Sequence, residues 1–167
     1  MQAAACQIGG NTTACRGILI VERDPTPGLY PLDAAMKEVL FVCVGNSARS
    51  QMAEGFFNHL AKGKAVATSA GTNPSSEISP LAVKVMKEAG IDISKQKPKK
   101  LTPGMLESAD RVITMGCGVE ETCPGAFVPT EDWALEDPKG KPIEKVREIR
   151  DEIKARVEKL TKEFLKE

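Results

Sequence analysis

The stretch that decides the fold is Val39–Gly55, which reads V-L-F-V-C-V-G-N-S-A-R-S-Q-M-A-E-G. It begins with the apolar, β-prone run Val39–Val42 and ends in residues that can open a helix. Between these parts lie Cys43 and Arg49, with five residues between them. A tight loop that joins a strand to a helix directs its backbone N–H groups and the positive end of the helix at one point. The stretch therefore predicts an anion-binding site.

The residue types in this loop fit a tetrahedral oxyanion. Arg49 offers a permanently charged, bidentate fork, and the same positive field favours the reactive thiolate form of Cys43. Gly45 permits close approach of the backbone, and Asn46 tolerates a left-handed conformation. We predict that Cys43 is the nucleophile, and that the anion is bound by Val44, Gly45, Asn46, Ser47, Ala48, Arg49 and Ser50. The alternative is a buried strand-end cysteine before an ordinary capped turn.

The loop resembles the phosphate-binding loop of low-molecular-weight protein tyrosine phosphatases and of the arsenate reductases that share their fold. The loop alone does not choose between the two groups. That choice depends on residues further along the chain.

Composition sets the broad class. The chain has 167 residues, 41% of them hydrophobic and 28% charged, which suits a globular protein with one main domain. Its 23 basic and 23 acidic residues cancel, which argues against a nucleic-acid partner. No apolar run is long enough to cross a bilayer, so we expect no membrane partner and a cytoplasmic location. The odd number of cysteines, five, argues against a secreted disulfide framework.

Residues 1–35 differ from the rest of the chain. They show little helical periodicity and several turn formers. We predict an N-terminal extension there, either a flexible tail or the product of an upstream start site, and a catalytic domain over residues 36–167. Cys6 and Cys15 fall in the extension, and their spacing matches no zinc signature.

From Glu38 onward, strand and helix patterns alternate. Strands are expected at residues 38–42, 64–69, 111–115 and 126–128, and helices at 48–61, 81–89, 103–108 and from 142 onward. The last helix carries an apolar stripe, which a coiled coil would also explain, but no second long helix is available to pair with it. The alternation predicts an α/β fold with a parallel sheet and right-handed crossovers.

Ligand sites in such sheets lie outside the carboxyl ends of the strands. Cys43 follows the first strand and Cys117 follows the third, so the two belong at one edge. Cys117 and Cys123 could be unrelated loop cysteines, ligands of a structural zinc that would need two more, or a resolving pair that removes a disulfide from Cys43. Asp137, followed by Pro138, is either a proton donor to a leaving oxygen or an exposed turn residue. His59, the only histidine, is more simply a surface residue.

Taken together, the loop, the Cys117/Cys123 pair and Asp137-Pro138 resemble the thioredoxin-coupled arsenate reductases from about residue 36 to the C-terminus. The resemblance implies a three-layer α/β sandwich with a four-stranded parallel sheet. It also implies that Cys43 attacks arsenate, that Asp137 is the general acid, and that Cys117 and Cys123 relay the disulfide to thioredoxin or a similar dithiol protein. Phosphate or sulfate would act as a mimic of arsenate, no metal or organic cofactor would be needed, and the enzyme would be a monomer.

This sequence departs from the family pattern in three places. The relay cysteines are one residue closer than in some members. Some members bind a monovalent cation beside the loop through an acid in the connector, whereas residues 95–100 here are rich in lysine, and we expect an ammonium in its place. Lysines rather than aromatic residues follow Asp137-Pro138, which disfavours a phosphotyrosine substrate. The alternatives are a phosphatase acting on a small phosphate ester, a non-catalytic oxyanion or redox sensor, and a transferase that passes arsenate to another thiol.

Overall fold

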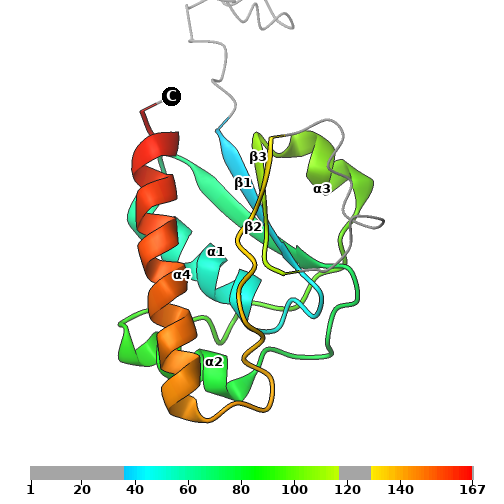
Figure 1. Cartoon of the computed structure of the whole chain (residues 1–167). Helices are drawn as coiled ribbons and strands as arrows, with labels where there is room; N and C mark the ends of the chain where they lie inside the picture. The colour runs from blue at the N-terminus through cyan, green and yellow to red at the C-terminus, as the bar shows by residue number, and fades with distance from the viewer. Residues whose placement is uncertain (1–35, 117–128, 167) are drawn as a thin grey trace, which may run out of the picture. The chain divides into compact units, whose positions relative to one another are not determined.

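Figure 1 shows a computed structural model of the chain, which describes residues 36–116 and 129–166. All of these residues belong to one unit of the chain, Ala35–Glu167. Strands and helices follow one another along it in the order that the sequence predicted. None of the helices in residues 36–116 and 129–166 combines the length and the apolarity that a membrane span requires.

The described strands form one four-stranded sheet in which every neighbouring pair is parallel. They are β1 (Glu38–Cys43), β2 (Val66–Gly71), β3 (Arg111–Thr114) and β4 (Thr130–Asp132), in the spatial order β2-β1-β3-β4. The interior strand β1 is buried over residues 39–43, as its continuous apolar run requires. The register pairs Cys43 with Gly71 and Val42 with Thr114, so the carboxyl ends of these strands meet at one edge.

Helices cover both faces of this sheet and complete a three-layer sandwich (Figure 1). The helices are α1 (Arg49–Ala61), α2 (Pro80–Glu88), α3 (Pro103–Ser108) and α4 (Ile143–Phe164). The larger core lies under α1 and α4, where the rings of Phe41, Phe57 and Phe164 follow one another at centroid distances of 6.1 and 6.0 Å. A smaller apolar cluster on the other face includes Leu40 and Val42 and packs against α3. The predicted fold class is therefore confirmed.

The last helix shows how directly an apolar stripe fixes packing. The stripe occurs every three or four residues, so one side of the helix is apolar throughout its length. Seven residues form the stripe. Ile143 is half-buried, and the other six are buried: Val146, Ile149, Ile153, Val157, Leu160 and Phe164. Each such side chain contributes about 1.5–3 kcal/mol when it is removed from water. The long helix covers the sheet together with α1, and no coiled coil is needed to explain it.

Two strands begin two or more residues from where they were expected. β2 begins at Val66 rather than residue 64, because Lys62 and Gly63 adopt positive φ and Lys64 remains in that turn. The fourth strand that the structure describes is Thr130–Asp132, which is fully exposed and polar and so gave no apolar signal. The range predicted for it, 126–128, lies outside the described residues. Ser79 occupies the N-cap position of α2 but makes no side-chain cap hydrogen bond.

Candidate active site

The loop between β1 and α1 is held by its carbonyl groups. Backbone N–H groups of the 73–79 segment donate to three of them over 2.8–3.0 Å. The acceptors are Val44, Gly45 and Ser47, and the donors are Asn73, Ser75 and Ser79. A fourth carbonyl, that of Asn46, accepts from the side chain of Gln51 at 3.1 Å. In a trans peptide the next N–H points the opposite way, so the N–H groups of residues 45–48 turn toward the inside of the loop, where an oxyanion would lie.

The sulfur of Cys43 lies inside this loop and is almost completely buried. The N–H of Asn46 donates to it at 3.2 Å, and Asn46 reaches that geometry with a φ of 45°. The hydroxyl oxygen of Ser50 lies 2.9 Å from the same sulfur. The structure thus places Cys43 where the sequence predicted a nucleophile.

The side-chain amide of Asn46 donates to the hydroxyl of Ser50, the residue beside the Cys43 sulfur. The N–H of Lys99 can only donate, and it lies 2.7 Å from Asn46 Oδ1. Asn46 Nδ2 must therefore face the other way, where it donates to Ser50 Oγ at 2.8 Å and to Ser69 Oγ at 2.9 Å. A thiolate at Cys43 can only accept, so with Cys43 ionised the proton of Ser50 would be directed at the sulfur.

The network continues to a buried carboxylate. Ser69 Oγ donates to Glu54, and the ammonium of Lys99 lies 3.3 and 3.4 Å from the two carboxylate oxygens. Lys99 belongs to the lysine-rich connector in which the sequence predicted an ammonium. Within the described residues, no group of three or more His, Cys, Asp or Glu side chains could hold a metal ion.

Arg49 is the first residue of α1, and its side chain is only 6% exposed. Nη1 donates to the carbonyl oxygen of Leu135 at 2.8 Å, and Nη2 donates to Asp137 at 3.1 Å. Asp137 is 60% exposed, so it lies at the surface end of this pair. The predicted anion-binding arginine and the predicted acid are thus brought together, although 88 residues separate them.

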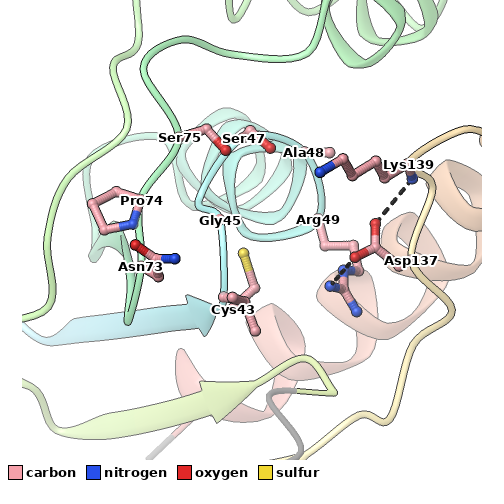
Figure 2. Close-up of a pocket in the computed structure, with 11 residues that line it drawn as sticks. Cys43, Gly45, Ser47, Ala48, Arg49, Asn73, Pro74, Ser75, Asp137 and Lys139 are labelled. Carbon is pink, nitrogen blue, oxygen red and sulfur yellow. Dashed lines mark hydrogen bonds and ion pairs between the residues drawn. The ribbon is translucent and has the colours of Figure 1, made fainter.

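These groups line a pocket of about 290 Å³, shown in Figure 2. Its lining residues are Cys43, Val44, Gly45, Ser47, Ala48, Arg49, Asn73, Pro74, Ser75, Asp137 and Lys139. None of them is aromatic, whereas a pocket for a phenyl ring would normally use such side chains. The pocket suits a small polar anion.

Several supporting residues were not identified from the sequence. Gln51, completely buried, donates to both oxygens of Asn46 and to the carbonyl of Lys97. Asp132 accepts from the N–H groups of Gly116 and Ala134 and from the hydroxyl of Thr114. Burial raises the pKa of Asp132, but these donors outweigh it and hold the pKa below its ordinary value. The carboxylate thereby orders the turn that leads to Leu135 and Asp137.

Cys117 and Cys123 lie outside the described residues. Gly116, the last described residue before them, lies against the site, because a Cβ added to it would be 3.3 Å from Nη1 of Arg49. The sole histidine, His59, is exposed in the last turn of α1, so it is a surface residue as predicted.

The model of the family described as low molecular weight phosphotyrosine protein phosphatase matches residues 38–167. This chain belongs to that phosphatase family. Among its curated relatives is a glutaredoxin arsenate reductase of Synechocystis, 46% identical over 75% of this chain and 96% of the relative. The resemblance that the sequence indicated is confirmed, because this chain matches the phosphatase family model and relatives named as arsenate reductases match about three quarters of it.

Solved structures of the phosphatase family agree with this placement. A thioredoxin-dependent arsenate reductase of Corynebacterium glutamicum superposes with a TM-score of 0.69 at 38% identity, over 79% of this chain. The match spans 63% of that protein's length. An arsenate reductase in a phosphate-binding state gives a TM-score of 0.71 at 43% identity, over 77% of this chain and 98% of that one.

Proposed function

We propose that this protein reduces arsenate to arsenite, with Cys43 as the nucleophile and with Cys117 and Cys123 as a resolving pair. The observation that carries this proposal is the position of the Cys43 sulfur, inside a loop of inward-facing N–H groups and in one pocket with Arg49 and Asp137. Its relatives named as arsenate reductases and the phosphate-binding state of one of them support an oxyanion of this size as the substrate.

The chemistry begins at Cys43. Its thiolate attacks As(V), an S–As bond forms, and one As–O bond breaks. Asp137, in its acid form, gives a proton to the departing oxygen, which leaves as water or hydroxide according to its own protonation. The N–H groups of residues 45–48 and the fork of Arg49 stabilise the negative charge that collects on the arsenic oxygens.

The relay then removes two oxidising equivalents. The thiolate of Cys117 attacks the sulfur of Cys43, an S–S bond forms, and the electron pair of the S–As bond stays with arsenic, which leaves as arsenite. Cys123 attacks Cys117, which frees Cys43 and leaves a Cys117–Cys123 disulfide. The position of Gly116 beside Arg49 supports this order, since the chain enters the relay segment next to the pocket.

The reductant is the next part of the proposal. Thioredoxin or a similar dithiol protein would reduce the Cys117–Cys123 disulfide by exchange. One relative is named as thioredoxin-dependent and another as a glutaredoxin arsenate reductase, so both systems belong in the assay. Because Cys43 must be a free thiol, we expect the enzyme to act in a reducing compartment, the cytoplasm. We also expect the enzyme to be a monomer.

A phosphatase is the second candidate, because the nucleophile, the arginine and the acid would also hydrolyse a small phosphate ester. The family description favours it. The relay cysteines distinguish the two, since a phosphatase does not need them. The non-aromatic pocket lining also weighs against a phosphotyrosine substrate.

The deciding experiment compares Cys117→Ser and Cys123→Ser with the parent. Arsenite formation is measured with a thioredoxin system and with a glutaredoxin system, beside hydrolysis of a synthetic aryl phosphate. Both variants should lose most arsenate turnover and keep any phosphatase activity. Mass spectrometry after arsenate treatment should find a Cys43–Cys117 disulfide in Cys123→Ser and a Cys117–Cys123 disulfide in the parent.

Cys15→Ser is the matched control, because it removes a cysteine that the relay does not use. It should turn over arsenate at the parent rate. If Cys117→Ser and Cys123→Ser also do so with either reductant, the relay is wrong. If the parent forms no arsenite with either system but hydrolyses the aryl phosphate, the phosphatase replaces the reductase.

A further inference from the structure

The turn after Asp137 brings a second cation to the pocket. Lys139 is one of the lining residues, and its backbone N–H donates to Asp137 at 2.9 Å. The turn is closed by the N–H of Lys141, which donates to the carbonyl of Pro138 at 3.2 Å. Figure 2 shows the extended side chain of Lys139 running from this turn toward Ala48 at the rim of the anion loop. The ammonium is thus directed across the pocket mouth.

No carboxylate of the described residues lies within ion-pair distance of the Lys139 ammonium. Its neighbours in sequence behave differently. Lys141 pairs with Glu136 at 2.7 Å, and Lys145 pairs with Glu136 at 3.5 Å and with Glu148 at 2.8 Å. Lys141 and Lys145 therefore form ion pairs outside the pocket, whereas Lys139 lines it.

The charges already in the pocket explain why this lysine matters. Arg49 is the other lining cation, and its charge is partly balanced by Asp137 at 3.1 Å. An oxyanion with two negative charges therefore enters a site where one cation is already partly neutralised. Lys139 supplies a positive charge that no described acidic side chain neutralises.

We propose that Lys139 is a substrate-binding residue, and that its ammonium holds the outward-facing oxygens of a doubly charged tetrahedral oxyanion whose inner oxygens lie in the anion loop. With arsenate as the substrate, this inference rests on the proposed function. The same interaction would also bind phosphate or sulfate, because these tetrahedral oxyanions resemble arsenate in charge and shape. Lysine suits the role because its ammonium on a flexible stem can follow the anion as it enters and leaves.

The test replaces Lys139 by methionine, which keeps the length of the stem and removes the charge, and by arginine, which keeps the charge. Lys141→Met is the matched control, because it removes the same charge two residues away, outside the pocket lining. The probe is inorganic phosphate, whose dissociation constant is measured by calorimetry at low and high ionic strength. Steady-state kinetics with arsenate gives KM and kcat separately.

Lys139→Met should raise the dissociation constant of phosphate and the KM for arsenate about tenfold at low ionic strength, as expected for one charge about 4 Å from the anion in a partly wet site. The kcat should change less than twofold, and high salt should reduce the difference between variant and parent. Lys139→Arg should keep most of the affinity. Lys141→Met should bind phosphate like the parent.

Three results would overturn the inference. Phosphate affinity could be unchanged in Lys139→Met, Lys141→Met could lose as much affinity as Lys139→Met, or kcat could fall while KM stays constant. The last result would mean that Lys139 acts only through the turn that holds Asp137. Failure of the proposed function is distinguishable, because the parent would then form no arsenite while Lys139→Met would still bind phosphate more weakly than the parent.

Discussion

Replacing Lys99 by methionine should destabilise the protein, because it leaves a carboxylate buried without its cation. The Lys99 ammonium lies 3.3 and 3.4 Å from the oxygens of Glu54, whose other described partner is the hydroxyl of Ser69. The Glu54 side chain is only 11% exposed. Methionine keeps the stem of Lys99 and its backbone N–H, so only the charge is removed.

The expected size of the effect follows from burial. Breaking a fully buried ion pair by removing one partner costs about 3–5 kcal/mol. Here the Lys99 side chain is 39% exposed, so water screens part of the interaction. We therefore expect a loss of about 1–2 kcal/mol in the free energy of unfolding. With a urea m-value of about 2 kcal/mol per M, the unfolding midpoint should fall by about 0.5–1 M.

The assay is urea unfolding followed by the fluorescence of Trp133, the only tryptophan, which is 3% exposed. Lys97→Met is the matched control, because Lys97 is an exposed lysine of the same connector with no described acidic partner. It should unfold at the parent midpoint. Adding Glu54→Gln to Lys99→Met removes the stranded charge and should recover part of the loss. A Lys99→Met midpoint equal to that of the parent would refute the reasoning, as would a double variant no more stable than the single one.

Four further predictions concern the loop and the extension. Cys43→Ser should abolish arsenate reduction and any phosphatase activity, because a hydroxyl is not ionised near neutral pH; arsenite above the buffer background would contradict this. Arg49→Lys should weaken phosphate binding about 10–100-fold in calorimetry, since lysine lacks the planar fork, and an unchanged affinity would exclude Arg49 from the anion site. Gly71→Ala should cost about 1–3 kcal/mol and weaken phosphate binding, because its Cβ would lie 2.5 Å from the oxygen of Val44. Gly104→Ala, which has open space, is the control, and equal unfolding midpoints would disprove the clash. Removal of residues 1–35 should leave the unfolding temperature and arsenate turnover unchanged, and a lower value of either would show that the extension supports the domain.

Local patterns in the sequence were enough to predict the fold and the loop that forms the middle of the candidate site. The apolar run before Cys43, the Gly-Asn-Ser turn and the helix after Arg49 are contiguous, so a strand, loop and helix could be predicted together. The apolar stripe of α4 is equally local. Asp137 was predicted as the acid because an acid before proline is a recognisable turn, and its distance from Arg49 followed only from the folded chain.

The supporting residues depend on contacts that no local pattern reveals. Gln51 bonds to the carbonyl of a residue 46 positions away, and the N–H of Lys99 reaches Asn46 across 53 positions. In the sequence Gln51 is an ordinary helix residue. Lys139 was noticed only as a replacement for an aromatic residue, since nothing local shows that its side chain lines the pocket.

The contact between Lys99 and Asn46 has its origin at the end of β2. Gly71 pairs with Cys43 in the sheet and bridges to Lys100 on its other side, where its N–H donates to the carbonyl of Lys99 at 2.8 Å. This bridge carries the connector past the loop, so that the N–H of Lys99 meets Asn46 Oδ1. A side chain at residue 71 would collide with the loop, and Ser69, two residues earlier, projects to the same face and takes the second proton of the Asn46 amide. The orientation of the Asn46 amide, which donates to the Ser50 hydroxyl beside Cys43, thus depends on a Ser-Ala-Gly strand end.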